Sequence, residues 1–367
     1  DVPYNWTLPV AREVKKLVSV PVATVGRVVS LEAGEKILED GDADIVAYGR
    51  SMLADADIAN KAESGECIRE CLNCNKGCVD AIQGRRYISC VLNAENGNEG
   101  TVFIKPAQDK KKVAVVGGGI AGLEAARVAA KRGHDVVVYE KSEKIGGQIH
   151  LAAVPPRKNE ILRAIEYYEK ILPELSVKVE LNTEPAYEEL NQYDNVILAI
   201  GAHNMELPMS VENSNVVSSW DVLNGEAVSG NCVVLGGGLV GTETAEFLAQ
   251  KGLKDSIIEM LSQIATGESE TVMPLIMKDF EEHDVKQYVN TKVKSIENNV
   301  IFATNTKDGA DITIEADTII NALGSKKNLF DDSKLTVPFE YVGDCSGERT
   351  ADISVAIRSG YQAGNEI

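Results

Sequence analysis

The 367-residue sequence predicts an α/β protein, in which short apolar strands alternate with amphipathic helices. Three observations lead to this prediction. Strand-like and helix-like runs alternate through residues 1–66. Two later stretches, 111–141 and 230–261, each pass from an apolar strand through a glycine-rich turn into a helix. Between these parts, residues 71–90 contain four of the seven cysteines of the chain, which marks a separate segment.

Composition and charge narrow the class of protein. Hydrophobic residues make up 44% of the chain and charged residues 25%, as in an ordinary globular protein, and the formal net charge is −19. Such a charge disfavours nucleic acids and anionic membranes as partners. No apolar run reaches the roughly 20 residues of a membrane span, and the opening residues lack the apolar core of a signal peptide, so we expect a cytoplasmic protein. Because Asp1 is not a start methionine, we also expect a fragment or a processed chain.

The first 66 residues have the pattern of a βα alternation. Residues 20–25 and 43–49 are short, apolar and rich in β-branched side chains, as buried parallel strands are, while residues 8–18 and 31–41 have helical spacing. A closed βα barrel needs eight strands and about 250 residues. Since two parallel strands cannot bury both of their faces, either most of such a barrel lies elsewhere or these units pack on another part.

Each of these two strands leads into a Gly-Arg pair, Gly26-Arg27 and Gly49-Arg50. Glycine lets a backbone N–H approach an anion closely, and arginine offers a fork of donors to a phosphate. The loops after the last two strands of a βα barrel are its usual phosphate site. The pairs therefore predict a phosphate-binding site, and two turn glycines with surface arginines are the alternative.

The cysteine segment contains Cys71, Cys74, Cys78 and Cys90, separated by two, three and eleven residues. Three thiols close together and a fourth further along suit a compact iron–sulfur cubane, whereas structural zinc usually shows two separated cysteine pairs. A zinc site stays the main alternative, and a redox disulfide is a further one. Cys67 is a fifth candidate ligand, so the spacing alone leaves the ligand set open.

The first glycine-rich turn is a dinucleotide-binding motif. An apolar strand runs into Gly117, Gly119 and Gly122 in the G-x-G-x-x-G spacing, a helix follows, and the next strand ends at Glu140. The glycines permit a tight turn and close approach of a pyrophosphate, and the helix N-terminus supplies a positive dipole end. Glu140, 18 residues beyond the last glycine, is predicted to accept from ribose hydroxyls.

The second motif repeats the first at the scale of a domain. Its glycines are Gly236, Gly238 and Gly241, and its acidic residue is Glu259. Glu259 favours a free ribose 2′-hydroxyl, whereas a 2′-phosphate would favour an arginine, which residues 260–261 do not supply. We therefore predict NADH at this motif rather than NADPH.

Two dinucleotide motifs in one chain imply two dinucleotides, usually a flavin and a nicotinamide. Three shorter stretches are assigned to the same sites. Gly147 and Gln148 follow the first motif, Gly324 ends a strand-like run after the second, and Gly343-Asp344 offers a carboxylate that could accept from a ribityl hydroxyl. The order of these stretches along the chain is what supports their assignment.

Together, these stretches resemble the C-terminal part of the multidomain old-yellow-enzyme-like NADH:flavin oxidoreductases, the group of 2,4-dienoyl-CoA reductase and 2-enoate reductase. Residues 41–62 look like the last barrel strand and FMN phosphate loop of that family, and the cysteine spacing matches its dienoyl-CoA reductase branch. The resemblance covers nearly the whole chain. It implies the end of a TIM (β/α)8 barrel, a 4Fe–4S cluster on the four clustered cysteines, and two Rossmann-like domains.

The resemblance also implies cofactors for each part. FMN is expected at the two Gly-Arg pairs, FAD at the first glycine motif and NADH at the second, while Cys67 has no assigned role. The expected parts are the C-terminal portion of the barrel (1–66), the cluster segment and linker (67–106), the first FAD-domain part (107–210), the NAD(P)H domain (211–325) and the second FAD-domain part (326–367).

The function that the resemblance implies is reduction of an activated C=C bond, with electrons passing from NADH to FAD, the 4Fe–4S cluster and FMN. Family members begin with a complete barrel, and this chain starts after what would be its sixth strand. We therefore expect the substrate site and its proton donor to lie in a missing barrel portion or a partner chain, and no catalytic residue is assigned.

Other functions stay open at this stage. The chain could be an electron-input module without its own substrate site, or an amine-dehydrogenase-type flavoprotein. A pyridine-nucleotide disulfide reductase is disfavoured, because Cys232 and Cys345 have no partner at redox spacing. The expected small-molecule substrate could be an enoate, an acyl-CoA thioester or an enone, and the sequence is compatible with a homo-oligomer without predicting one.

Overall fold

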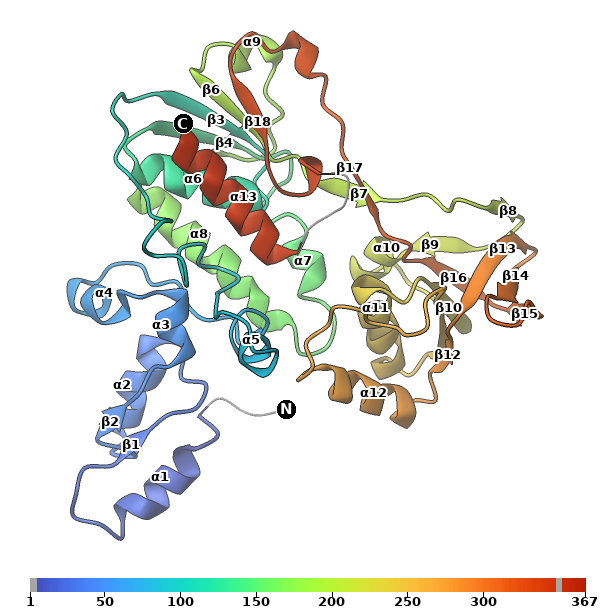
Figure 1. Ribbon diagram of the computed structural model, residues 1–367, viewed down its shortest axis with the longest axis horizontal. Helices are drawn as coiled ribbons and strands as arrows, with labels where there is room; N and C mark the ends of the chain where they lie inside the picture. Colours follow the sequence, from blue (N-terminus) through green and yellow to red (C-terminus); the bar gives the residue numbers. More distant parts are fainter. Residues whose placement is uncertain (1–4, 348–351) are drawn as a thin grey trace.

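The computed structural model describes residues 5–347 and 352–367 (Figure 1). It consists of a small N-terminal part, an irregular cysteine segment and two larger α/β parts (Figure 1). Residues 1–4, which begin the expected barrel portion, lie outside the described residues. Within the part of the chain that the structure describes, no helix is both long and apolar enough to cross a membrane.

The N-terminal part keeps the predicted βα alternation, but its strands are short. The two strands pair in parallel and have only two residues each, where the sequence predicted runs of six and seven. Among the described residues these two strands form a sheet of their own, and apolar side chains such as Val20 and Ile45 stay exposed. The elements are α1 (Leu8–Lys15), β1 (Ala23–Thr24), α2 (Leu31–Glu39), β2 (Ile45–Val46), α3 (Arg50–Ala54) and α4 (Ile58–Ser64).

The cysteine segment joins this part to the first large domain. It has no regular structure from Glu66 to Gly77, and then forms the short helix α5 (Val79–Gln83), which begins directly after Cys78. Figure 1 shows α5 between the N-terminal part and the two α/β parts. A segment with so little secondary structure depends on side-chain contacts, or on a bound group, for its shape.

The first large domain contains a five-stranded parallel sheet of order β18-β6-β3-β4-β5. Helices α6 and α13 pack closely beside it (Figure 1). Gly360 and Gly364 make this packing possible, because a Cβ at either position would press on the backbone of α6. The elements are β3 (Lys112–Val116), α6 (Ile120–Lys131), β4 (Asp135–Tyr139), α7 (Ile149–Ala152), α8 (Arg163–Glu174), β5 (Lys178–Glu180), α9 (Tyr187–Leu190), β6 (Asn195–Leu198), β18 (Phe339–Tyr341) and α13 (Ile353–Glu366).

The second large domain repeats this plan with a parallel sheet of order β12-β11-β10-β16-β9. A second sheet of order β15-β14-β13-β8 packs against it, and residues 306–310 make the hairpin turn between β14 and β15. The elements are β8 (Ser210–Glu212), β9 (Val216–Ser218), α10 (Ser219–Leu223), β10 (Asn231–Leu235), α11 (Leu239–Gln250), β11 (Lys254–Ile258), α12 (Met273–Glu282), β12 (Lys286–Tyr288), β13 (Thr291–Glu297), β14 (Val300–Asn305), β15 (Asp311–Glu315) and β16 (Thr318–Asn321).

A two-stranded antiparallel ribbon connects the two domains. It consists of β7 (Ala202–Asn204) and β17 (Ser325–Lys327), so the chain leaves the first domain on one strand and returns on the other (Figure 1). After this return, β18 pairs with β6 and completes the first sheet. The second domain is therefore an insertion in the first, held by two adjacent strands.

Candidate dinucleotide and cysteine sites

The first glycine turn has the geometry of a site that approaches a ligand closely. Gly117 has φ of +111°, and a Cβ on Gly122 would overlap the carbonyl oxygen of Gly117. A Cβ on Gly119 would meet no atom within 4 Å, so this glycine faces open space at the start of α6. The backbone N–H groups of this turn and the helix dipole are therefore available to an anion such as a pyrophosphate.

Glu140 is hydrogen-bonded to the backbone of this turn. Its side chain is buried, and its two carboxylate oxygens accept hydrogen bonds from the backbone N–H groups of Gly118, at 2.7 Å, and Ser142, at 2.8 Å. A carboxylate has further lone pairs for a ribose hydroxyl. The structure thus places Glu140 at the turn that the sequence predicted, and its contact with a ribose stays a prediction.

Residues far apart in the sequence gather around the same turn. Gln148 Nε2 donates to Asp344 Oδ2 at 2.8 Å. A Cβ on Gly147 would lie 3.2 Å from the Cα of Gly119, and a Cβ on Gly343 would lie 2.8 Å from the Cβ of Ala121. The four residues that sequence order alone assigned to the first dinucleotide site are therefore brought together there.

The second glycine turn repeats this geometry. Gly236 has φ of +103°, a Cβ on Gly241 would overlap the carbonyl oxygen of Gly236, and Gly238 faces open space. Glu259 accepts hydrogen bonds from the N–H groups of Gly237 and Leu261, both at 2.7 Å. The two turns thus share one acid-to-backbone arrangement. Gly324, with φ of +113°, lies directly before the return strand β17 and also faces open space.

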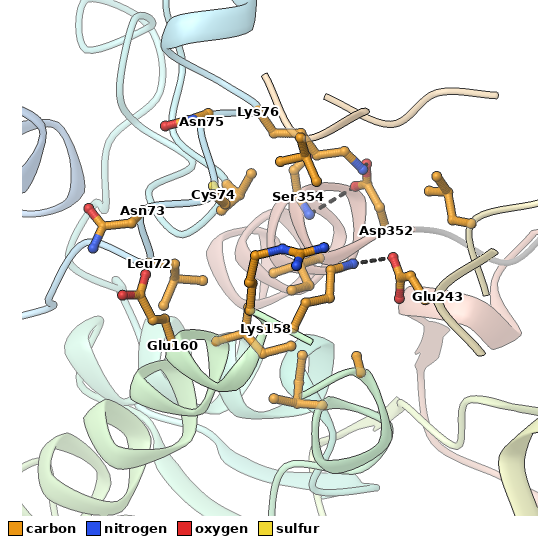
Figure 2. A pocket seen from close by; sticks show the side chains of 18 of the residues that line it. Leu72, Asn73, Cys74, Asn75, Lys76, Lys158, Glu160, Glu243, Asp352 and Ser354 are labelled. Atoms are coloured by element: carbon orange, nitrogen blue, oxygen red, sulfur yellow. Dashed lines mark hydrogen bonds and ion pairs between the residues drawn. The ribbon is translucent and has the colours of Figure 1, made fainter. Parts of the chain in front are cut away.

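Both turns open on one cavity of about 1350 Å³. Its lining includes Gly119 and Ile120 from the first domain, Leu239 and Val240 from the second, and Cys74 from the cysteine segment. Figure 2 shows Cys74 and its neighbours on one side of this space and Lys158 and Glu243 on another. One cavity therefore borders the cysteine segment and both domains, to which the sequence assigned separate cofactors.

Charged side chains cross the cavity between the two domains. Lys158 donates to Glu243, and Arg157 donates to Glu246 and, at 2.9 Å, to Asp279 (Figure 2 shows the first pair). Burial raises the pKa of Glu243, and it raises the pKa of Glu246 to about 7. Sequence reasoning missed these residues, because an ion pair between distant segments has no local pattern. The only local signal is the spacing of Glu243 and Glu246, one turn apart on α11.

The four clustered cysteines are half-buried and form no disulfide. Burial raises the pKa of the Cys71 and Cys90 thiols, and it raises the pKa of Cys74 to about 12. Charge on Cys90 and Cys78 raises the pKa of both Cys71 and Cys74 further. Across residues 5–347 and 352–367, no set of three or more His, Cys, Asp or Glu side chains has the arrangement of a metal site.

The surroundings of the cysteines nevertheless suit a bound cluster. The backbone N–H of Asn73 donates to Cys71 Sγ at 3.4 Å. The backbone N–H groups of Leu92 and Asn93 hydrogen-bond Cys90 and lower the pKa of its thiol. Such N–H···S bonds tune the reduction potentials of iron–sulfur clusters. Asn73 and Asn75, on either side of Cys74, both have positive φ. Cys67 takes a different position, with its thiol 3.9 Å from the carbonyl oxygen of Tyr167.

The two predicted phosphate-binding arginines line the same cavity and contact other side chains. Arg27 forms an ion pair with Glu160, and Arg50 donates to the amide oxygen of Asn75. Gly26 has φ of +146°, and a Cβ there would lie 2.8 Å from Thr7 Oγ1, whereas Gly49 has open space around it. Their role at an FMN phosphate stays a prediction.

Comparison with known families agrees with this geometry. The pyridine nucleotide-disulphide oxidoreductase family matches residues 111–342, which include both glycine turns. The chain belongs to this family. The NADH:flavin oxidoreductase / NADH oxidase family matches residues 5–67, so the N-terminal part corresponds to a piece of its TIM barrel. The two matches support flavin and NADH-type cofactors, and they confirm the family and fold class predicted from the sequence.

Several characterised relatives match nearly the whole chain. Bilirubin reductase of Mediterraneibacter gnavus is 46% identical over 100% of this chain and 58% of its own length. NADH oxidase of Thermoanaerobacter brockii is 36% identical over 99% of this chain and 58% of its own length. Cinnamate reductase of Clostridium sporogenes is 35% identical over 100% of this chain and 55% of its own length. The chain thus spans a little over half the length of these relatives.

A solved structure has the same arrangement of parts. A 2-naphthoyl-CoA reductase complex superposes with a TM-score of 0.89 at 29% identity, covering 99% of this chain and 57% of that one. The N-terminal part, cysteine segment and two domains therefore keep one relative placement in both chains.

Proposed function

We propose that the protein is an NADH-dependent flavoprotein oxidoreductase that reduces an activated C=C bond, with electrons passing from NADH to FAD, a 4Fe–4S cluster and FMN. The observation that carries the proposal is the shared cavity, onto which both glycine turns and Cys74 open and which Arg27 and Arg50 also line. When bound, a flavin can accept a hydride and release electrons singly, and a 4Fe–4S cluster carries one electron at a time.

The residues of this chain would bind and orient these groups. The turn at Gly117–Gly122 would hold the FAD pyrophosphate, and the Gln148–Asp344 pair would lie along the flavin side chain. The turn at Gly236–Gly241 would hold NADH, and Glu259 would favour a ribose with a free 2′-hydroxyl. Because these turns face one cavity, that cavity would receive both the nicotinamide and the flavin.

The cluster is proposed on Cys71, Cys74, Cys78 and Cys90. Their spacing, the N–H···S contacts and the half-buried position support it. The ion pairs of Lys158 and Arg157 across the cavity would keep the NADH domain close to the FAD domain. Cytoplasmic location and the oligomeric state stay expectations from the sequence.

The substrate class follows from the relatives rather than from this chain. Cinnamate, bilirubin and 2-naphthoyl-CoA, which the names of relatives mention, all contain conjugated C=C bonds. Because the chain covers little more than half of these proteins, we propose that the substrate site lies in a barrel portion beyond this sequence or in a partner chain. An assay of NADH-dependent reduction of cinnamate and bilirubin would test this substrate class. The reaction is monitored by the loss of substrate absorbance.

Cofactor content of the anaerobically purified protein tests the electron path. We expect FAD with about four iron and four sulfide per chain, and bleaching of the flavin by NADH. FMN in addition would indicate that the barrel portion is present in the molecule, and its absence would indicate the electron-input half alone. Zinc in place of iron would contradict the path through the cysteine segment.

A cysteine substitution separates the first step from the second. Cys74→Ala should abolish the cluster and electron transfer to FMN, and leave NADH reduction of FAD at its original rate, because the two glycine turns are untouched. Stopped-flow absorbance would follow both flavins. Cys67→Ala is the matched control, since Cys67 lies in the same segment but outside the proposed ligand set, and it should change neither step. FMN reduction at the normal rate in Cys74→Ala would exclude the cluster as the relay.

A further inference from the structure

Asn75 connects three parts of the molecule through its side chain. It lies between Cys74 and Lys76, with φ of +62°, and its amide oxygen accepts from Arg50 of the N-terminal part. Its amide nitrogen donates to Thr271 Oγ1, at 2.9 Å, in the second domain. A left-handed conformation outside glycine costs free energy, so the contacts on both sides of the amide help to hold Asn75 in place.

A second contact lies beside the first. Ser269 Oγ is 2.8 Å from Thr271 Oγ1 and donates to Asp80 Oδ1, also at 2.8 Å. Ser269 is 2% exposed, so these hydroxyls interact away from bulk water, where a lost partner is costly. The cysteine segment is thus bonded to the second domain at Asn75 and Asp80, which flank Cys78.

The loop that makes these contacts is also bonded to the second glycine turn. Residues 265–272 lie between β11 and α12 in the chain, and the N–H of Ala265 donates to the carbonyl oxygen of Gly237 at 2.7 Å. Ala265 has φ of +51°, which is unfavourable for alanine and indicates a loop held in a defined shape. We call residues 265–272 the docking loop.

Asn75, which the docking loop contacts through Thr271, is also bonded to one of the clustered cysteines. The backbone carbonyl oxygen of Asn75 accepts from the N–H of Cys78 at 3.2 Å, and Cys78 Sγ lies 3.7 Å from it. A displacement of Asn75 would therefore change the environment of a proposed cluster ligand. Figure 2 shows Asn75 beside Cys74 at the rim of the shared cavity.

We propose that the docking loop couples occupancy of the second glycine turn to the redox state of the cysteine segment, with Ser269, Thr271 and Asn75 as positioning residues. The inference rests on the proposed 4Fe–4S site. A dinucleotide contacts the turn that Ala265 holds, and the loop passes the resulting shift to Asn75 and Asp80. Arg50 shares the same amide, so the coupling extends toward the predicted FMN phosphate site.

Linkage makes the coupling measurable. If a nucleotide binds with different affinity to the oxidised and reduced protein, it must shift the midpoint potential of the cluster correspondingly. For a one-electron couple, a tenfold difference in affinity equals a shift of about 59 mV. Coupling free energies between sites commonly correspond to about fivefold differences or more. ADP-ribose is a suitable probe, because it has the ADP and ribose groups of NADH and cannot transfer a hydride.

The experiment is a redox titration of the holoprotein, monitored by the EPR signal of the reduced cluster, with and without saturating ADP-ribose. We expect a shift in potential corresponding to at least about a fivefold affinity difference. The Ser269→Ala/Thr271→Val double variant should lose the shift and keep the affinity of the oxidised protein for ADP-ribose within about twofold, so that the affinity of the reduced protein is the one that changes. Thr306→Val is the matched control, since its hydroxyl donates to Asn290 within the second domain, and it should keep the shift.

The outcomes distinguish this inference from the proposed function. Absence of a cluster signal in the wild type would contradict the proposed function itself. A normal cluster signal with a potential that ADP-ribose leaves unchanged, or an equal shift in the double variant, would overturn only the coupling. Hydrogen–deuterium exchange of residues 71–90 gives an independent check: ADP-ribose should slow exchange there in the wild type and in Thr306→Val, and not in the double variant.

Discussion

At each glycine turn, one buried or half-buried glutamate accepts two backbone N–H groups. Glu140 and Glu259 have the same pair of contacts. Each accepts from the N–H of the glycine between the first two motif glycines, Gly118 or Gly237, and from the N–H two residues after itself. The sequence could predict both residues, because strand, turn, helix and acid lie within about 30 residues. It could not predict that the carboxylates brace the turns. That role depends on side-chain direction, which motif spacing does not define.

Asp255 on β11 is a buried carboxyl group in the second domain. It is 4% exposed, neither of its carboxylate oxygens has a hydrogen-bond partner among the described residues, and burial raises its pKa to about 7. The pKa in the unfolded chain is about 3.9. Between these values the folded state keeps a proton that the unfolded state releases, so stability is highest below about pH 4 for this group and falls as pH rises to 7.

Asp255→Asn should therefore flatten the loss of stability between about pH 4 and pH 7. The loss from this group is up to about 4 kcal/mol, at roughly 1.4 kcal/mol for each pKa unit. The variant should be more stable than the wild type at pH 8, because a neutral amide replaces a buried charge. Urea unfolding at pH 5 and pH 8 measures the effect. Asp311→Asn is the control: Asp311 is exposed and its carboxylate bonds Lys294, so it should not flatten the slope.

Helix α13, at the end of the described chain, packs against helix α6, which follows the first glycine turn. Gly360 lies against the backbone of Ala121, in the first turn of α6, where the FAD pyrophosphate is proposed to bind. The sequence predicted the glycine turn and its helix, and it gave no indication of α13. The contact between these helices joins residues more than 200 positions apart, so no local pattern encodes it.

Gly360→Ala should press the added methyl group onto the carbonyl oxygen of Ala121 and push the two helices apart. Overpacking of this kind costs about 1–3 kcal/mol of stability. Because the displaced turn binds FAD in our proposal, FAD retention on gel filtration should fall together with the melting temperature. Gln362→Ala, an exposed change on the same helix, should have neither effect, and equal FAD retention in both variants would separate this packing from the FAD site.

The N-terminal elements illustrate what apolar patterning can predict. Both expected strands exist at the expected places, but each has two residues, and in the part of the chain that the structure describes they pair only with each other. Apolar patterning predicts which residues suit a buried strand. The length of a strand depends on the strands that pair with it. The match to the barrel family covers only residues 5–67 of this chain.

At the scale of the whole molecule, two domains and a cysteine segment meet at one cavity. Each part could be predicted from its own motif, and their meeting could not. Gln148 and Asp344 were both assigned to one cofactor from their order in the chain, yet their contact joins residues on either side of an inserted domain. The charged pairs across the cavity were missed for the same reason, since Arg157 and Lys158 belong to a segment without any motif.

Arg157 makes two ion pairs between the two domains. Its backbone has φ of +62°, and its side chain bonds Glu246 on α11 and Asp279 on α12. Removing the guanidinium leaves the buried carboxylate of Glu246 and the half-buried carboxylate of Asp279 without their cation, which is costlier than losing an exposed pair. Arg157→Met keeps most of the side-chain length and should let the second domain move about the β7–β17 ribbon.

We expect faster proteolysis of Arg157→Met at residues 202–210 and 325–330, which connect the domains. We also expect slower NADH reduction of FAD, because the nicotinamide and flavin rings would meet less often. Bound FAD should stay at wild-type content, since the first glycine turn is untouched. Lys307→Met removes an exposed cation from the hairpin of the second domain and should leave cleavage and flavin reduction unchanged. If Arg157→Met slows flavin reduction without faster cleavage, Arg157 acts on the rings locally and the ion pairs do not hold the domains together.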